Sequence, residues 1–435
     1  MSTGCMRVLV TGIGAVTGMG IGAQVLWDGL CNGRSAVRPW RLQELDDFPV
    51  RYAAPVDWDL FSAAYSDRTW WPMHMERRSR FGLAAAEEAL HDSGITHGVF
   101  EGERVGVAIG SGVPQRDAAD MLLAVGEEGP DWRYLIERRD RLNPNTGLFH
   151  SNDHLAAMCA ALAGARGPLF HFSTACSGAA HAIGHGFRAI RRGEADAMLV
   201  GGADSVLNLT TMLGLHMLGA PSTSERFGKA LSRPFDRDRS GFVASEGAGM
   251  LLLESEASAT RRGARVYAEI AGFGSALDAY QITAPHPEGK GAALAIMRAL
   301  HDAKLAPEDI DHINAHGTST ALNDPAETMA IKQVFARNAH YRNLTVSANK
   351  SMLGHLIAAA GGPECIAAVL SVRHALAPPT LNLEITDPQC DLDYVMGCSA
   401  RPQRIRAAIS NSFGFGGLNT AIAIKAYDSR PSAHG

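Results

Sequence analysis

The sequence lacks an apolar run long enough to cross a bilayer, because no stretch of about 18 consecutive apolar residues occurs in its 435 residues. Its first apolar run, residues 8–10, ends at Thr11-Gly12 and is too short for the core of a signal peptide. Basic residues are not in excess: 40 Lys and Arg stand against 45 Asp and Glu, and the net charge of −5 argues against a nucleic-acid partner. The seven cysteines show no CxxC spacing, which argues against a zinc ribbon or a disulfide framework. These absences predict a soluble, cytoplasmic, globular protein of the size of an enzyme.

The composition is that of a folded chain larger than one ordinary domain. Hydrophobic residues make up 46% and aromatic residues 7%, which excludes long-range disorder, and the length predicts two fused halves or one large multilayer unit. Strand-like runs alternate with amphipathic or Ala-rich stretches, which is typical of an α/β fold with helix-covered sheets. The strand-like runs are residues 7–11, 105–109, 169–173, 197–200, 249–254, 310–315, 344–347 and 407–410, and the helical stretches are 80–92, 179–191, 292–303 and 326–335.

Two segments far apart in the chain share one pattern. Residues 171–173 lead through a turn of small residues into a helical stretch over 177–191, and residues 346–348 lead through another turn into a stretch over 354–372. Both helices are rich in Ala and Gly and apolar on every face, as expected for helices buried between two sheets. The pattern predicts a duplicated strand–turn–helix unit with a half boundary near residues 255–265, although α/β proteins also show such similarity by chance.

A cysteine stands in the first of these turns, in Ser-Thr-Ala-Cys-Ser-Gly at residues 173–178. Between a strand and a helix N-terminus, the helix dipole and free backbone N–H groups stabilise a thiolate. The same N–H groups can form an oxyanion hole for a thioester carbonyl. Cys176 is therefore a candidate nucleophile, and the alternative is a small buried cysteine that fills a gap in the core.

Three further motifs offer polar or aromatic groups at turns. His316 leaves a predicted strand into a polar loop, which is where α/β enzymes place chemistry. Lys350 and His355 bracket a helix start and would be costly to bury without partners. Residues 410–419 surround Phe415 with glycines, as in a mobile loop that gates a pocket or places a backbone N–H. A strand-capping histidine, a surface lysine and an ordinary Gly-rich turn are the alternatives.

A cysteine, a histidine, a Lys–His pair and a Gly–Phe loop, in this order, resemble the β-ketoacyl-[acyl-carrier-protein] synthases, specifically the synthase II-like thiolase-fold condensing enzymes. The resemblance runs over residues 7–423 and includes Gly-Gly-Ala-Asp at 201–204 and Arg-Pro-Phe-Asp at 233–236. It implies an α/β, thiolase-like five-layer αβαβα fold made of two duplicated halves. Residues 1–260 would form the half with the nucleophilic Cys, and residues 261–435 the half with the catalytic His, Lys and His.

The resemblance implies a role for each matched residue. Cys176 would take an acyl chain from the pantetheine thiol of a carrier protein, with the backbone N–H groups of Cys176 and Phe415 holding the oxyanion. His316 and His355, as neutral donors, would stabilise the enolate formed when malonyl-carrier protein loses CO2. The enolate would then attack the acyl thioester to give a β-ketoacyl product.

Other matched residues would support this chemistry. Lys350 would act electrostatically, paired with Glu327 so that neither charge is stranded, and Asp324 would be a further supporting residue. Thr318 and Thr320 match hydroxyls that hold the pantetheine arm. Phe415 also matches the gating aromatic, and Val113 stands where such enzymes limit the depth of the acyl pocket at the dimer interface. The resemblance implies that no metal or organic cofactor is bound, because the 4′-phosphopantetheine arrives on the carrier protein.

The implied partner is an acidic acyl carrier protein, which local basic patches would dock although the chain is net negative. Two basic stretches are candidates, and a solvated helix face is the alternative for both. They are Arg77-Arg78 with Arg80, and Arg138-Arg139 with Arg141.

Several departures from the family pattern bear on the pathway. Leu353 and Leu418 replace threonines, Ser224 stands where a basic residue is common although Arg226 is near, and residues 150–154 are unusually polar. With apolar residues at these places in the Lys–His and Gly–Phe motifs, the chain resembles the ketosynthase subunits of type II polyketide and aryl-polyene systems. Those subunits pair with a chain-length-factor subunit. The sequence thus predicts a homodimer or such a heterodimer, in fatty acid synthesis or, slightly favoured, a specialised polyketide or polyene pathway.

Two other functions stay open at this point. One is a non-catalytic partner that only shapes the pocket of another subunit, against which Cys176 argues. The other is a degradative thiolase, which would need a second cysteine near the C-terminus. Cys390 and Cys398 precede the Gly–Phe motif and do not fit that requirement.

Overall fold

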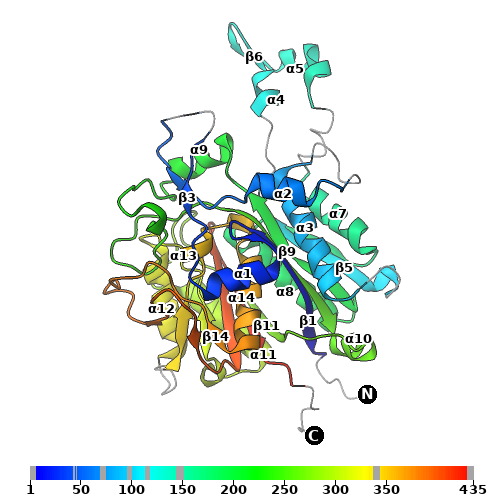
Figure 1. Cartoon of the computed structure of the whole chain (residues 1–435), viewed down its shortest axis with the longest axis vertical. Coiled ribbons are helices and arrows are strands. Elements are labelled where there is room, and N and C mark those ends of the chain that lie inside the picture. Colours follow the sequence, from blue (N-terminus) through cyan, green and yellow to red (C-terminus); the bar gives the residue numbers. More distant parts are fainter. Residues whose placement is uncertain are drawn as a thin grey trace.

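The computed structural model describes residues 6–42, 45, 47–68, 75–95, 100–112, 118–143, 151–336 and 343–428. Within these ranges, no helix has both the length and the apolar character that a membrane crossing requires. Figure 1 shows a layered α/β body from which the segment 118–143 projects. This segment carries α4 (Ala118–Leu122), β6 (Val125–Gly126), β7 (Gly129–Pro130) and α5 (Arg133–Glu137).

One large sheet runs through the body, and its strand order repeats. The first half contributes, in spatial order, β8 (Leu169–Phe172), β5 (Val105–Ser111), β9 (Ala197–Ser205), β10 (Glu246–Ser255) and β1 (Val8–Thr17). The second half contributes β13 (Thr345–Ser347), β12 (His312–Asn314), β17 (Ala407–Gly414), β18 (Leu418–Lys425) and β11 (Ala268–Leu277), with β15 (Asp393–Tyr394) added at its edge.

Both halves therefore have the same topology. Counted along the chain, each places its third, second, fourth, fifth and first strands side by side. In each, the second strand pairs parallel with the third and fourth, and the remaining pairs are antiparallel. A short antiparallel pairing of β1 with β11 joins the halves. The repeat confirms the predicted duplication, and the two turns singled out in the sequence both follow the third strand of their half.

Alternating side chains on the strands separate three cores. On β10, Leu251 and Leu253 face a central core, whereas Met250 and Leu252 face an outer one, as period-two alternation requires. The central core holds α1 (Ala23–Cys31), α8 (Gly178–Arg191) and α14 (Gly361–His374). The outer cores hold α3 (Arg77–Asp92) and α7 (His154–Ala163) on one side and α11 (Lys290–Ala303) and α12 (Asn323–Phe335) on the other (Figure 1). The two halves of the sheet thus form two β layers that cover the central helices from either side, which gives the expected five-layer αβαβα arrangement.

The close approach of α8 to the sheet depends on a glycine. A Cβ at Gly110 on β5 would lie 2.1 Å from the carbonyl carbon of Gly178, the first residue of α8, so only glycine lets the start of this helix rest on the strand. In the second half, the helix predicted over 354–372 begins later, at Gly361. Positive φ angles at Gly354 (+69°) and Ile357 (+48°) interrupt the helical path before that residue.

Candidate active site

Cys176 lies in the turn between β8 and α8, in the 3-10 segment η3 (Ala175–Ser177). Ala175 has φ +45°, a left-handed conformation that is uncommon for a residue with a Cβ, so the chain turns sharply at this point. The Ser177 hydroxyl donates to the carbonyl of Thr174 at 2.7 Å and closes the turn. Cys176 is 6% exposed, and it lines a pocket.

His355 from the second half meets this cysteine. Its Nε2 lies 3.2 Å from the Cys176 Sγ. Its Nδ1 accepts the backbone N–H of Ile357 at 3.2 Å, so in the neutral ring the proton resides on Nε2. His355 therefore directs an N–H donor at the sulfur.

His316 lies beside His355, with ring centroids 5.4 Å apart and ring planes at 82°. The Lys350 ammonium stands 3.2 Å from its Nδ1 and donates to its backbone carbonyl at 2.7 Å. An ammonium has donors only, so the Nδ1 of His316 accepts and its Nε2 carries the proton. Both imidazoles thus offer donors rather than lone pairs.

The partner of Lys350 differs from the predicted one. Its Nζ forms an ion pair with Glu364 at the start of α14, and both side chains are at most 2% exposed. Glu327, the predicted partner, instead accepts the backbone N–H groups of His316 and Gly317, each at 2.8 Å. It holds the loop of His316, and the pairing of Lys350 with Glu327 was wrong.

Glu364, the partner of Lys350, was not singled out from the sequence. It lies in the stretch after His355 that was treated as wholly apolar, and the one signal was an acid in a Gly-Gly-Pro-Glu segment 14 residues after Lys350. Burial, partly offset by Lys350, raises the pKa of Glu364 to about 7. Only the contact between Lys350 and Glu364 in the folded chain identifies the pair.

The two histidines are neutral at neutral pH. Burial first, and then the positive charge of Lys350, holds the pKa of His355 well below its usual value. The same causes, together with the neighbouring His355, lower the pKa of His316. Neutral rings with N–H donors suit a site in which negative charge develops.

The Cys176 thiol is less acidic than the helix-terminus argument predicted. Burial raises its pKa to about 12, although Lys350 and the backbone N–H groups of Phe415 and Cys176 act in the opposite direction. The resting residue is thus a thiol. The dipole of α8 does not outweigh desolvation, whose penalty falls on the charged form.

This thiol gives a first testable expectation. A thiol alkylates through its thiolate, so below the pKa the rate rises about tenfold per pH unit. We expect the iodoacetamide reaction of Cys176, followed by mass spectrometry of its peptide, to keep rising from pH 7 to pH 10 without a plateau. The exposed Cys398 is the internal control in the same digest. A plateau at Cys176 below pH 8 would show that the charged form is stabilised more than burial allows.

The Gly–Phe motif forms a hairpin turn that reaches the cysteine. Most of the predicted loop is strand, because β17 runs to Gly414 and β18 begins at Leu418. The turn between them brings the N–H of Phe415 close enough to the Cys176 sulfur to lower its pKa. Gly416 N–H donates to the carbonyl of Ile282 at 2.6 Å, which ties the turn to the segment after β11.

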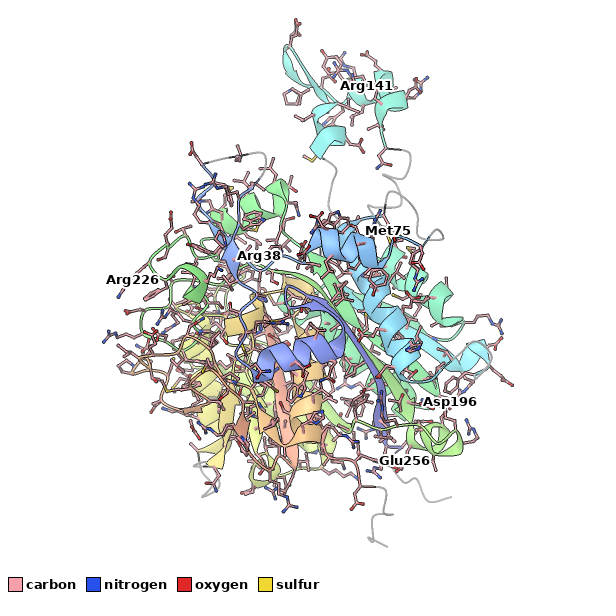
Figure 2. The ribbon with its side chains drawn as sticks, in the orientation of Figure 1. Arg38, Met75, Arg141, Asp196, Arg226 and Glu256 are labelled. Carbon is pink, nitrogen blue, oxygen red and sulfur yellow. The ribbon has the colours of Figure 1, made fainter. Side chains whose placement is uncertain are left out.

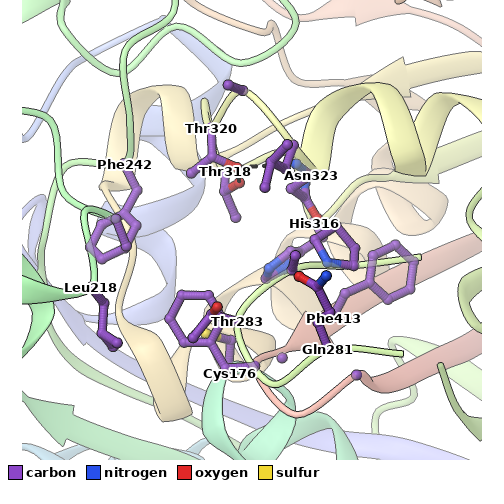
Figure 3. A pocket seen from close by; sticks show the side chains of 18 of the residues that line it. Cys176, Leu218, Phe242, Gln281, Thr283, His316, Thr318, Thr320, Asn323 and Phe413 are labelled. Carbon is purple, nitrogen blue, oxygen red and sulfur yellow. Dashed lines mark hydrogen bonds between the residues drawn. The ribbon is translucent and has the colours of Figure 1, made fainter. Parts of the chain in front are cut away.

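Cys176, His316 and His355 line a pocket of about 560 Å³. Figure 3 shows Cys176 on one side of it and Thr318 with Thr320 on the opposite wall, with His316 between them. The two threonine hydroxyls lie 2.8 Å apart. Asp324 does not line the pocket; it accepts the N–H of Thr318 at 3.1 Å and so positions this wall.

Within the described ranges, the side chains of Cys176, His316 and His355 also lie as close together as the ligands of a metal ion would. One ligand atom each of Cys176, His316 and His355 lie within 4.8 Å of one another. Zinc binds imidazole through a lone pair. Because both Nδ1 atoms accept hydrogen bonds and both Nε2 atoms carry protons, the chemistry of this group favours an anion over a cation.

The three arginines of the first predicted docking stretch differ in their exposure to solvent. Arg78 is 2% exposed, bound to Glu76 and to the carbonyl of Gly112, so it is not available to a partner at this surface. Arg77 is partly exposed but paired with Glu246, and Arg80 is half-buried.

The second predicted basic stretch, Arg138-Arg139 with Arg141, lies on the projecting segment. Arg138 donates to the carbonyls of Leu123 and Val125, and Arg141 lies on the projecting segment in Figure 2. Val113 lies outside the described residues.

Comparisons with known proteins match nearly the whole chain. The family models "Beta-ketoacyl synthase, N-terminal domain" and "Beta-ketoacyl synthase, C-terminal domain" match residues 6–259 and 267–384. A 3-oxoacyl-[acyl-carrier-protein] synthase 2 of Synechocystis is 39% identical over 97% of this chain and 98% of its own. A putative polyketide beta-ketoacyl synthase 1 of Streptomyces cyaneus is 40% identical over 96% and 97%.

Solved structures are also similar. A type II polyketide ketosynthase in complex with its acyl-carrier protein superposes with a TM-score of 0.87 at 32% identity, covering 98% of this chain and all of that one. The ishigamide ketosynthase/chain length factor gives a TM-score of 0.84 at 32% identity, with the same coverage.

Proposed function

The chain belongs to the β-ketoacyl synthase family, and from this premise we propose that it is a condensing enzyme that joins an acyl group on Cys176 to a malonyl unit on a carrier protein. The observation that carries the proposal is the contact of the Cys176 sulfur with the His355 Nε2 at 3.2 Å, beneath the Phe415 N–H. A nucleophile, two neutral donors and an oxyanion hole meet there from both halves of the fold. This constellation suits thioester chemistry.

The first half-reaction is acyl transfer. The sulfur of Cys176 attacks the carbonyl of an acyl thioester, and the backbone N–H groups of Cys176 and Phe415 stabilise the oxyanion. The carbon–sulfur bond to the pantetheine arm breaks as the bond to Cys176 forms. The proton lost by the Cys176 thiol leaves on the pantetheine thiol, so no net proton is exchanged.

The second half-reaction forms a carbon–carbon bond. Malonyl thioester loses CO2, and its electron pair remains as an enolate whose oxygen accepts from the Nε2–H groups of His316 and His355. The enolate carbon attacks the acyl carbonyl, and Cys176 leaves as a thiolate that takes up one proton. Neutral histidines suit this step, since imidazolium rings would hold the malonyl carboxylate and oppose its loss.

The surrounding residues would position these groups. Lys350 orients His316 through its Nδ1, and Glu364 balances the lysine charge. Glu327 and Asp324 hold the loop that carries His316. Thr318 and Thr320, across the pocket from Cys176, would hold the pantetheine arm that the carrier protein supplies.

The carrier protein would reach the pocket over its apolar rim. Leu218, Ile282 and Leu322 line the pocket and are 52%, 80% and 60% exposed. Of the predicted basic stretches, Arg77, Arg80 and the Arg138–Arg141 cluster remain docking candidates. Val113 would limit the acyl pocket, and Phe415 would gate it.

The division into halves would fall near residue 260. The first half ends with β10 at Ser255 and the second begins with β11 at Ala268. Residues 1–260 would then carry the nucleophile, and residues 261–435 the two histidines and Lys350. Neither half would be active alone, because the Cys–His contact spans both.

A specialised polyketide or polyene pathway is slightly favoured over housekeeping fatty acid synthesis. Relatives of both kinds are about equally identical to this chain, whereas the similar structures with TM-scores of 0.87 and 0.84 are a polyketide ketosynthase and a ketosynthase with its chain length factor. The chain would then act as the catalytic subunit of a heterodimer. A homodimer that extends saturated chains unaided would contradict this assignment.

The proposal is tested by incubating the protein with acyl-carrier protein and locating the acyl adduct by mass spectrometry. We expect one adduct, on the peptide that contains Cys176, and its conversion to β-ketoacyl-carrier protein when malonyl-carrier protein is added. Absence of an adduct in the presence of a co-purified partner would instead support a non-catalytic, pocket-shaping subunit. A thiolase is not favoured, because neither Cys390 nor Cys398 lines the pocket.

A further inference from the structure

A buried carboxylate that the mechanism above does not use lies at the end of β9. Asp204 is 3% exposed, and its Oδ1 accepts the backbone N–H of Ser205 at 2.9 Å. Its Oδ2 accepts the backbone N–H of Ala358, in the other half of the fold, at 3.1 Å. A Cβ at Gly112 would lie 2.5 Å from this oxygen, so the carboxylate fits against bare backbone.

Ala358 belongs to a strained turn that follows His355. The preceding residue, Ile357, has φ +48°, a left-handed conformation that is an outlier for a β-branched side chain. Such a conformation persists only where surrounding contacts over-determine it. The strain has a chemical consequence here, because the N–H of Ile357 is the group that donates to the Nδ1 of His355.

The contact of Asp204 with Ala358 is well placed to hold this turn. It fixes the peptide that directly follows Ile357, while Ala358 packs on Gly178 at the start of α8, with its carbonyl oxygen 3.1 Å from the position of a Cβ there. Asp204 is thus fixed on β9, and its Oδ2 holds the turn of residues 355–358, which lies against the start of α8. The buried Arg78 supplies the positive charge that offsets it.

We propose that Asp204 is a positioning residue for His355: by holding the N–H of Ala358 it maintains the strained Ile357 peptide, and thereby keeps the Nε2–H of His355 directed at the reacting atoms. The inference rests on the proposed function and adds a residue to it. It predicts that Asp204 matters for the step that uses the histidine donor and little for the step that uses the backbone oxyanion hole.

Activation of the thiol does not explain this carboxylate. A negative charge near Cys176 opposes thiolate formation, and Asp204 indeed acts to raise the pKa of that thiol. Burial also makes the charge costly to keep. The hydrogen bond that Asp204 accepts from Ala358, in the other half of the fold, explains why a carboxylate is buried at this position.

To test the inference, acyl loading and condensation are measured separately in the variant Asp204→Asn. The amide keeps the shape of the side chain, but its single oxygen can accept only one of the two backbone N–H groups, those of Ser205 and Ala358, that the carboxylate accepts. We expect acyl loading of Cys176 to stay within about threefold of wild type. Malonyl decarboxylation and condensation should fall about 10- to 100-fold, which is less than the 10²- to 10³-fold typical when an oxyanion donor is removed outright. In ¹⁵N-histidine spectra, the His355 signal should shift from the Nε2–H tautomer toward a mixture.

Glu246→Gln is the matched control, because Glu246 is a buried acid on the neighbouring strand that binds Ser205 and Arg77 but not the 355–358 turn. It should leave the ratio of the two half-reactions unchanged. If Asp204→Asn lowers loading and condensation equally, or leaves both unchanged with an unaltered histidine spectrum, the positioning role is refuted.

A second variant relieves the strain directly. Glycine adopts a φ of +48° without steric penalty, so Asp204→Asn/Ile357→Gly should recover part of the condensation rate relative to Asp204→Asn. Its free energy of unfolding should be lower, because the Ile357 side chain packs on the cluster of Phe48, Val206 and Met212. No recovery in a folded double variant that still loads acyl groups would contradict the inference. Failure of the proposed function is recognised separately, because wild-type protein would then form no acyl adduct on Cys176.

Discussion

Replacing Cys176 by alanine is expected to abolish the acyl adduct and to lower chain extension about 10⁴-fold or more, since the covalent intermediate can no longer form. The substitution removes one buried atom, so the fold should persist with at most a small loss of stability. The two histidine donors remain in place. Decarboxylation of malonyl-carrier protein should therefore continue in this variant while carbon–carbon bond formation stops.

Cys159→Ala provides the matched comparison. Cys159 is fully buried in α7, in the outer core away from the pocket, and its removal should leave both half-reactions near wild type. The measurement is mass spectrometry of the acyl-enzyme together with release of labelled CO2. An acyl adduct of wild-type yield on Cys176→Ala would place the nucleophile elsewhere and end the proposed mechanism.

The parts of the site that could be predicted were those encoded in short stretches of sequence. Cys176 stands in the turn after β8, and His355 follows the short helix α13 (Lys350–Leu353) that comes after β13. The small residues at both places are visible in the sequence. The repeated pattern of strand and turn could be recognised in both halves, because it depends on local periodicity. The meeting of the two turns then followed from the family resemblance.

What could not be predicted depended on distant contacts. The choice of Glu364 rather than Glu327 as the partner of Lys350 is decided by how α14 packs on the sheet. Arg78 stood in a helix whose charged residues could equally have faced solvent, and only its contact with Glu76 places it inside. The raised pKa of the Cys176 thiol likewise comes from burial, which no local pattern measures.

The Lys350–Glu364 pair gives the second large effect. Glu364→Leu leaves the Lys350 ammonium without its counter-ion in a site where it is 1% exposed. Breaking a buried pair in this way typically costs about 3–5 kcal/mol, so we expect a loss of that size in the free energy of unfolding. Urea titrations at one protein concentration measure it. The exposed pair Lys332–Asp391 is the control, and Asp391→Leu should change the free energy by about 1 kcal/mol or less.

Removing both partners should separate stability from catalysis. In Lys350→Met/Glu364→Leu no charge is stranded, and apolar replacements of a buried pair are often neutral for stability, so most of the lost free energy of unfolding should return. Condensation should not return, because the ammonium that donates to the Nδ1 of His316 is gone and the imidazole can then place its proton on either nitrogen. Acyl loading relies on the backbone N–H groups of Cys176 and Phe415, so it should survive in the double variant. If condensation recovers along with stability, Lys350 serves only to satisfy Glu364, and the orientation of His316 must come from the hydrogen bond of its own backbone N–H to Glu327.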